Sequence, residues 1–203
     1  MFVTVSFLTI ISPGPAILLA INNGLSHNMK GVGISSFANI LGLFTLSSVS
    51  MLGLGAILQT SSTLFLVMKV IGAGYLIYMG IKQFRNLANV FDNDSGVQIE
   101  KNNFQLFKKG FLVSITNPKP IVFFTAIFPI FLNPANALVP QFLIMTFTFM
   151  LLSFSTLMSF AYFAKYFKFW FSNKKRAILF NRISGSIFVM LGLGLLRVEN
   201  KTQ

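Results

Sequence analysis

The chain has little charge, almost no acid and no cysteine. Only four of its 203 residues are acidic and only one is histidine. The absence of cysteine excludes disulfide bonds and thiol chemistry. The acidic residues lie outside the long apolar runs, at Asp92, Asp94, Glu100 and Glu199. No carboxylate pair, metal-binding cluster or Ser–His–Asp set can therefore form within those runs, and we expect no catalytic residue, metal site or cofactor.

Long uncharged apolar runs fill most of the sequence. Hydrophobic residues make up 54% of the chain and its mean hydropathy is +0.74. No Asp, Glu, Lys or Arg occurs within residues 31–68, and only Lys119 occurs within residues 110–164. A membrane-spanning helix needs about 20 mostly apolar residues. The runs therefore predict an all-α polytopic membrane protein, with the lipid bilayer as its surroundings.

The net charge of +12 can be interpreted in two ways. In a soluble protein it would suggest nucleic acid. Here the Lys and Arg residues cluster in short segments between apolar runs, where such residues orient a membrane protein and meet anionic lipid headgroups. We therefore expect no nucleic-acid partner.

Six spans are expected from the apolar runs, and the basic residues orient them. The first, third and fifth linkers are basic, whereas the second and fourth carry no charge. Because basic short loops stay in the cytoplasm, we expect the odd linkers inside and both termini outside. The first run lacks the features of a signal peptide and is expected to remain as a span. The spans are residues 2–22, 32–58, 64–82, 110–132, 141–164 and 177–196.

One long linker divides the sequence into two similar halves. Residues 1–83 and 110–203 each hold three spans, and residues 84–109 join them. Residues 71–85 resemble residues 183–197, with Gly80 and Gly192 in register. Because three is odd, the second half must enter the membrane from the opposite side. The sequence thus predicts two inverted three-helix repeats, a construction common in transporters.

The first helix of each repeat contains a Pro-x-Pro triplet. Proline removes a backbone donor and clashes with the preceding turn. A broken helix at membrane depth is tolerated only against protein or a water-filled cavity, and matched breaks in two repeats indicate a binding site. A half-helix restarting near Pro15 would offer its positive end to a carboxylate. The predicted site comprises Ser12, Pro13, Gly14, Pro15, Asn117, Pro118, Lys119 and Pro120.

Lys119 is the most informative single residue. It lies about nine residues, or ~13 Å of helix, into the fourth span. A charge at that depth is costly and usually marks a transport pathway. The alternative is that its long side chain reaches the headgroups. Asn117 could hold either Lys119 or a ligand through hydrogen bonds.

Small and polar residues share one face of the second span, namely Gly31, Ser35, Ala38, Asn39 and Gly42. Their spacing places them on one side of a helix. Small residues allow close helix contact, and an asparagine can hydrogen-bond across the interface. The face therefore indicates tight packing against the broken first span, substrate contact through Asn39, or both.

The ordered motifs resemble those of the lysine-exporter superfamily, most closely its homoserine/threonine branch. They are Ile-Ser-Pro-Gly-Pro at 11–15, Lys-Val-Ile-Gly-Ala-Gly-Tyr-Leu-Ile-Tyr-Met-Gly at 69–80, Gly-Phe-Leu at 110–112 and Asn-Pro-Lys at 117–119. The resemblance implies a multi-pass exporter of amino acids in the bacterial inner membrane. It further implies coupling to the proton gradient and a possible homodimer. Many family members carry an acidic residue directly after Pro-Gly-Pro, where this chain has Ala16.

Two functions remain open at this point. The first is export of neutral amino acids such as threonine, homoserine or leucine, because a cationic substrate would find no intramembrane carboxylate. The backbone at Gly14 and the ammonium of Lys119 would then receive the substrate carboxylate, while Asn39 and Asn117 orient it. The alternative is a passive channel or a non-transporting membrane component on the same fold.

Overall fold

The computed structural model describes residues 2–12, 14–60, 62–85, 102–133 and 135–197. Throughout these residues the regular structure is helical, as the sequence predicts. Pro13 and most of the expected linker, residues 86–101, lie outside the described residues. The helices are α1 (Phe2–Ile11), α2 (Pro15–Ser26), α3 (Met29–Thr60), α4 (Ser62–Arg85), α5 (Asn103–Thr116), α6 (Pro118–Val122), α7 (Leu138–Tyr162), α8 (Ala164–Ser172) and α9 (Lys174–Arg197), with a π-helical turn η1 (Phe123–Ile127) and a 3-10 turn η2 (Phe128–Phe131) after α6.

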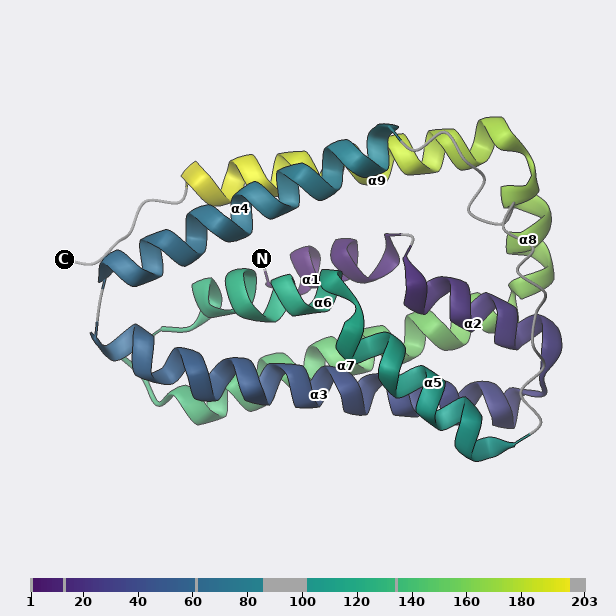
Figure 1. The fold of residues 1–203 in the computed structure, drawn as a ribbon, viewed down its shortest axis with the longest axis horizontal. Helices are drawn as coiled ribbons and strands as arrows, with labels where there is room; N and C mark the ends of the chain where they lie inside the picture. Colours follow the sequence, from purple (N-terminus) through teal and green to yellow (C-terminus); the bar gives the residue numbers. More distant parts are fainter. Residues whose placement is uncertain (1, 13, 61, 86–101, 134, 198–203) are drawn as a thin grey trace.

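The helices form an elongated bundle with the short helix α8 at one end (Figure 1). Helix α4 runs alongside α9 on one side of the bundle, and α3 and α7 lie on the other (Figure 1). The broken pairs α1–α2 and α5–α6 lie between these sides (Figure 1). Helix α2 packs against α7, and α5 packs against α3. Each broken helix thus contacts a long helix from the other half of the sequence.

By length and composition, three of the described helices could cross a membrane. They cover Met29–Gly53, Leu138–Tyr162 and Lys174–Gly194. Two further spans could form from the bent pairs, in which α1 and α2 meet at 57° and α5 and the helix after Asn117 meet at 48°. The polytopic, helical class is therefore confirmed, with three to five spans of this kind among the described residues.

Both breaks occur at the Pro-x-Pro triplets. The expectation that a helix restarts at Pro15 is confirmed, since proline is favoured in the first turn and α2 begins there with extended Gly14 as its N-cap. At the second break, the side chain of Asn117 caps α6 by accepting from the Lys119 amide at 3.1 Å. The chain then remains irregular through η1 and η2. Ser50 of α3 donates to the Phe124 carbonyl at 2.6 Å and so satisfies one group of this irregular backbone.

Glycines bring the backbones of α4 and α9 into contact. A Cβ added at Gly80 would lie 2.6 Å from the carbonyl oxygen of Gly185, and one added at Gly192 would lie 2.8 Å from the carbonyl oxygen of Ala73. By contrast, a Cβ at Gly74 or Gly194 would meet nothing within 4 Å. Close approach without side chains maximises van der Waals contact between helices, the main source of association in lipid.

The small-residue face of α3 is buried, but its glycines pack chiefly on α5 rather than on the broken first span. A Cβ at Gly42 would lie 2.7 Å from the Cβ of Ser114, and one at Gly110 would overlap the Ser35 backbone. Asn39 donates a long hydrogen bond of 3.5 Å to the Gly110 carbonyl. Close packing is confirmed. The main neighbour of this face is α5, while Ser35 and Asn39 also lie beside Ala16 and Ala20 of the broken first span.

Aromatic side chains form the core beyond the second break. Phe149 of α7 packs on Phe123 and Phe124 of η1, with ring centroids 4.5 and 5.0 Å apart. Phe2 of α1 meets Phe131 of η2 at 5.3 Å. Because Phe123 and Phe124 are almost fully buried, this aromatic cluster holds the irregular turns in place.

The basic segments give a testable orientation. The start of α3, the start of α5 and helix α8 lie at one end of the bundle, on the right in Figure 1. Since basic residues favour the cytoplasmic side, we expect this end inside. Basic residues in these segments are Lys30, Lys108, Lys109, Lys165 and Lys168.

Single-cysteine labelling should report this orientation directly, because the chain contains no cysteine of its own. We expect Asn136→Cys, before α7, to react with a membrane-impermeant thiol reagent added to intact cells. Lys174→Cys, at the start of α9, should react only after the membrane is permeabilised. Both side chains are exposed, so accessibility depends on the side of the membrane. The reverse labelling pattern would overturn the orientation.

Candidate functional site

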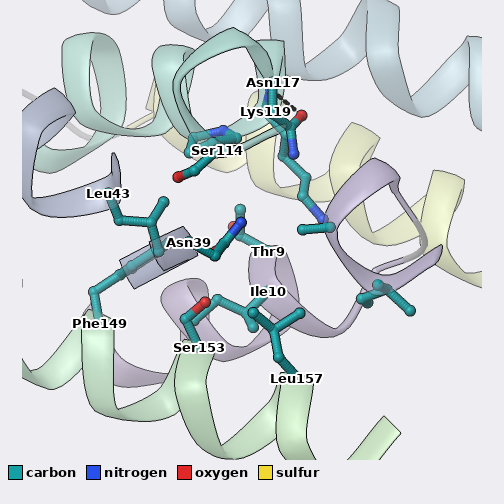
Figure 2. Close-up of a pocket in the computed structure, with 13 residues that line it drawn as sticks. Thr9, Ile10, Asn39, Leu43, Ser114, Asn117, Lys119, Phe149, Ser153 and Leu157 are labelled. Carbon is teal, nitrogen blue, oxygen red and sulfur yellow. Dashed lines mark hydrogen bonds between the residues drawn. The ribbon is translucent and has the colours of Figure 1, made fainter. Parts of the chain in front are cut away.

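A cavity lies between the two breaks and the long helices α3 and α7. The space open to the centres of water molecules is about 40 Å³, which is room for a few waters, since one requires ~10–15 Å³. Figure 2 shows side chains converging on this cavity from both halves of the chain. Its lining comprises Thr9, Ile10, Ala16, Ile17, Asn39, Leu43, Ser114, Asn117, Lys119, Pro120, Phe149, Ser153 and Leu157.

Lys119 joins the second break to the first. Its Nζ donates to the Ser12 carbonyl oxygen at 2.8 Å and to the Ser12 hydroxyl oxygen at 3.1 Å. Ser12 follows the end of α1, where the break leaves carbonyl groups without helical donors. The Lys119 side chain is therefore directed to the partner break, in preference to the headgroup contact that was the alternative.

Two positive groups converge at this point. A Cβ added at Gly14, the N-cap of α2, would lie 3.5 Å from Nζ of Lys119. The N-terminus of a helix carries a partial positive charge and free N–H groups. Among the described residues, the ammonium donates to the neutral oxygens of Ser12, and no acidic residue lines the cavity. An anion would complete this arrangement.

Two amides predicted from the sequence reach the cavity. Asn117 is 4% exposed and its side-chain oxygen is used to cap α6, which leaves its amide N–H groups for another acceptor. Asn39 is also 4% exposed and lies between Lys119 and Leu43 in Figure 2. Both residues could therefore donate to a polar ligand.

The predicted prolines differ in their placement. Pro120 is buried and lines the cavity, whereas Pro15 and Pro118 are exposed and do not line it. Pro13 lies outside the described residues. The structure therefore brings together Ser12, Gly14, Asn39, Asn117, Lys119 and Pro120, while Pro15 and Pro118 shape the breaks from outside.

The sequence analysis did not identify three hydroxyl residues that line the cavity, namely Thr9, Ser114 and Ser153. Thr9 lies one turn before Ser12, and Ser114 lies one turn before Asn117. Residues three apart share a helix face. The position one turn before each break could therefore have been predicted to line the cavity. Their chemistry differs, because Thr9 donates to the Val5 carbonyl at 2.8 Å whereas the buried Ser114 hydroxyl has no partner.

The remaining lining is apolar. Figure 2 shows an apolar wall opposite Lys119, formed by Leu43 of α3 and by Phe149 and Leu157 of α7. Among the described residues, no group of three or more His, Cys, Asp or Glu could hold a metal ion. The cavity can thus receive an amphiphilic ligand, with an anionic group at Lys119 and an apolar group at this wall.

Comparison with known proteins relates this chain to a family of translocators. A model of the LysE type translocators matches residues 7–199. The chain is 30% identical over 195 residues to the homoserine/homoserine lactone efflux protein of Salmonella typhi, covering 94% of this chain and 92% of that protein.

Two other relatives cover similar lengths. The leucine efflux protein of Enterobacter sp. (strain 638) is 29% identical, over 93% of this chain and 90% of its own length. An uncharacterized membrane protein of Bacillus subtilis (strain 168) is 30% identical, over 95% of both chains. No solved structure is significantly similar to this chain.

Proposed function

This chain belongs to the family of LysE type translocators, and from that premise we propose that it exports neutral amino acids through the cavity at Lys119. The family makes it a multi-pass bacterial inner-membrane transporter of amino acids and not an enzyme. The observation that carries the proposal is the Lys119 ammonium, which lies at the N-terminus of α2 and donates to two oxygens of Ser12.

The substrate carboxylate would bind at this positive point. It would accept from Nζ of Lys119 and from the free N–H groups that begin α2, as anions do at helix N-termini. Asn39 and Asn117 would orient it with their amide N–H groups. All amino-acid substrates share a carboxylate, so this end of the cavity would serve any of them.

The side chain of the substrate is inferred to be uncharged. Among the described residues, none that lines the cavity is acidic, so a cationic side chain such as that of lysine would be buried without a counter-ion. Leu43, Phe149 and Leu157 offer an apolar surface instead. Threonine, homoserine and leucine fit this description, and two similar proteins are named for homoserine and leucine efflux.

We propose that six spans form two inverted repeats, residues 1–83 and 110–203, joined by residues 84–109. The glycine contacts of α4 and α9 support this. The register that relates Gly80 to Gly192 also relates Ala73 to Gly185. The contact of Gly80 with Gly185 therefore has its counterpart in the contact of Gly192 with Ala73, as a two-fold axis between the helices requires.

Transport would proceed by movement of the two repeats about the cavity. The cavity holds only a few waters, so an amino acid enters only when the surrounding helices separate. The π-helical turn η1 begins three residues after Pro120, which lines the cavity, and π-helical turns are frequent at functional sites. We further propose that proton entry drives export, as the family resemblance implies.

Energised inside-out membrane vesicles test the function. In such vesicles the cytoplasmic face is outward and the lumen is acidified. We expect vesicles that contain the protein to accumulate labelled threonine, homoserine or leucine against a gradient, and a protonophore to collapse the accumulation. Vesicles without the protein provide the control. Flux that runs only downhill would establish a passive channel instead, and no flux of any of the three would overturn the proposal.

A further inference from the structure

Helix α8 (Ala164–Ser172) crosses the end of the bundle instead of running along it (Figure 1). The candidate spans of α3, α7 and α9 follow the long axis of the bundle (Figure 1). A helix that crosses this axis at one end therefore lies along the surface of the membrane. With the orientation that the basic segments favour, this surface is the cytoplasmic one.

One face of α8 packs on the protein. Ala164 is 1% exposed, and the ring of Phe167 stacks on Phe160 of α7 with the ring centroids 4.5 Å apart. Both residues pack in the apolar cluster that includes Ile17 and Ala20 of α2. Residues three apart share a helix face, so this contact uses one face of α8 and turns the others away from the bundle.

A second face of α8 is aromatic. Tyr166 and Phe169 are three residues apart, and they are 62% and 73% exposed. Trp170 lies on the same side, four residues after Tyr166, and its ring meets Phe180 of α9 with centroids 6.2 Å apart. Tyrosine and tryptophan are enriched where a membrane meets water. This face is therefore suited to the boundary between lipid headgroups and acyl chains.

The third face of α8 is basic. Lys165 and Lys168 are three residues apart and both are exposed. The exposed residues Lys174, Lys175 and Arg176 follow at the start of α9. No acidic residue occurs within residues 164–176 to neutralise these charges. A basic cluster of this size on an amphipathic helix is typical of segments that bind anionic lipids.

We propose that α8 is an interfacial helix that binds the headgroups of anionic phospholipids through Lys165 and Lys168. The aromatic face enters the membrane surface, as in other amphipathic helices that lie in the plane of a bilayer, and the two lysines meet the lipid phosphates. The basic start of α9 adds to the attraction. The protein thereby gathers anionic lipids around α8 in preference to zwitterionic ones, which the general placement of basic loops in the cytoplasm does not require.

Trp170 can report this contact, because it is the only tryptophan of the chain. The full chain is reconstituted in vesicles of phosphatidylcholine and phosphatidylglycerol, with bromine near the headgroup of only one of the two lipids. Bromine quenches tryptophan fluorescence at short range. We expect brominated phosphatidylglycerol to quench Trp170 more than the same fraction of brominated phosphatidylcholine does. Added salt should reduce this difference, because it screens exposed charges.

Removing the two lysines should weaken the preference. In the double variant Lys165→Gln with Lys168→Gln, we expect the preference for phosphatidylglycerol to fall by at least about fivefold, which is the contribution of roughly one basic residue near an anionic surface. The control is Lys82→Gln with Arg85→Gln, which removes the same charge from exposed positions in the last turn of α4. This control should retain the wild-type preference. Melting temperatures in detergent check that both variants fold.

Three outcomes would overturn the proposal. The first is equal quenching of the wild type by the two brominated lipids, and the second is an unchanged preference in the α8 variant. The third is quenching by neither lipid, which would mean that α8 is held away from the membrane or is covered by a protein. None of these measurements involves transport, so the proposed function is tested separately.

Discussion

Replacing Lys119 with methionine should abolish amino-acid export, with at least about a hundredfold loss of transport rate. The change removes the ammonium that we place against the substrate carboxylate, and hydrogen bonds to charged groups contribute about 1.5–3 kcal/mol each. A factor of ten corresponds to about 1.4 kcal/mol, so the loss of two such bonds yields at least about a hundredfold. The measurement is uptake of labelled amino acid by inside-out vesicles.

The same variant should still insert and accumulate in the membrane. Methionine has nearly the shape of lysine, and replacing a charge at membrane depth with an apolar group removes a desolvation penalty. Lys82→Met is the control, because Lys82 is an exposed residue near the end of α4 and does not line the cavity. Near-normal export by Lys119→Met, at wild-type amounts of protein, would remove Lys119 from the site.

The sequence was sufficient to locate the two breaks and the residue that links them. Two proline triplets in otherwise apolar runs cannot continue a helix, so the positions of the breaks follow from covalent structure. Lys119 was identifiable because it is the only charge within residues 110–164. Its contact with Ser12 joins the two halves of the chain, however, and no local pattern specifies which distant carbonyl a lysine will reach.

The hydroxyl residues of the cavity were harder to foresee. Serine and threonine occur throughout these helices, and several return their hydroxyl to the preceding turn, as Thr45 and Thr148 do. Only the three-dimensional packing distinguishes Ser114, which lacks that bond. The main neighbour of the α3 face, helix α5, could not be foreseen for a related reason. A stripe of small residues predicts close packing, but its neighbour depends on how the two halves interlock.

Enlarging a glycine where α4 meets α9 should destabilise the folded protein severely. Gly80→Leu would drive a side chain into the backbone at Gly185, since even a Cβ there lies 2.6 Å from the carbonyl oxygen. Overpacking typically costs about 1–3 kcal/mol and more where backbone must move. For a chain of this length that corresponds to a fall of roughly 10 °C in melting temperature, measurable on protein in detergent. Gly192→Leu should behave alike.

Each of these glycines has a matched control on its own helix. Gly74 of α4 and Gly194 of α9 are exposed, and a Cβ at either would meet nothing within 4 Å. Gly74→Leu and Gly194→Leu should therefore retain or raise the melting temperature, because leucine favours a helix by nearly 1 kcal/mol over glycine. Equal losses at Gly80 and Gly192 with none at the controls would support the two-fold relation of α4 and α9. Loss at only one of the pair would contradict it, since symmetry-related contacts must resist the same insertion.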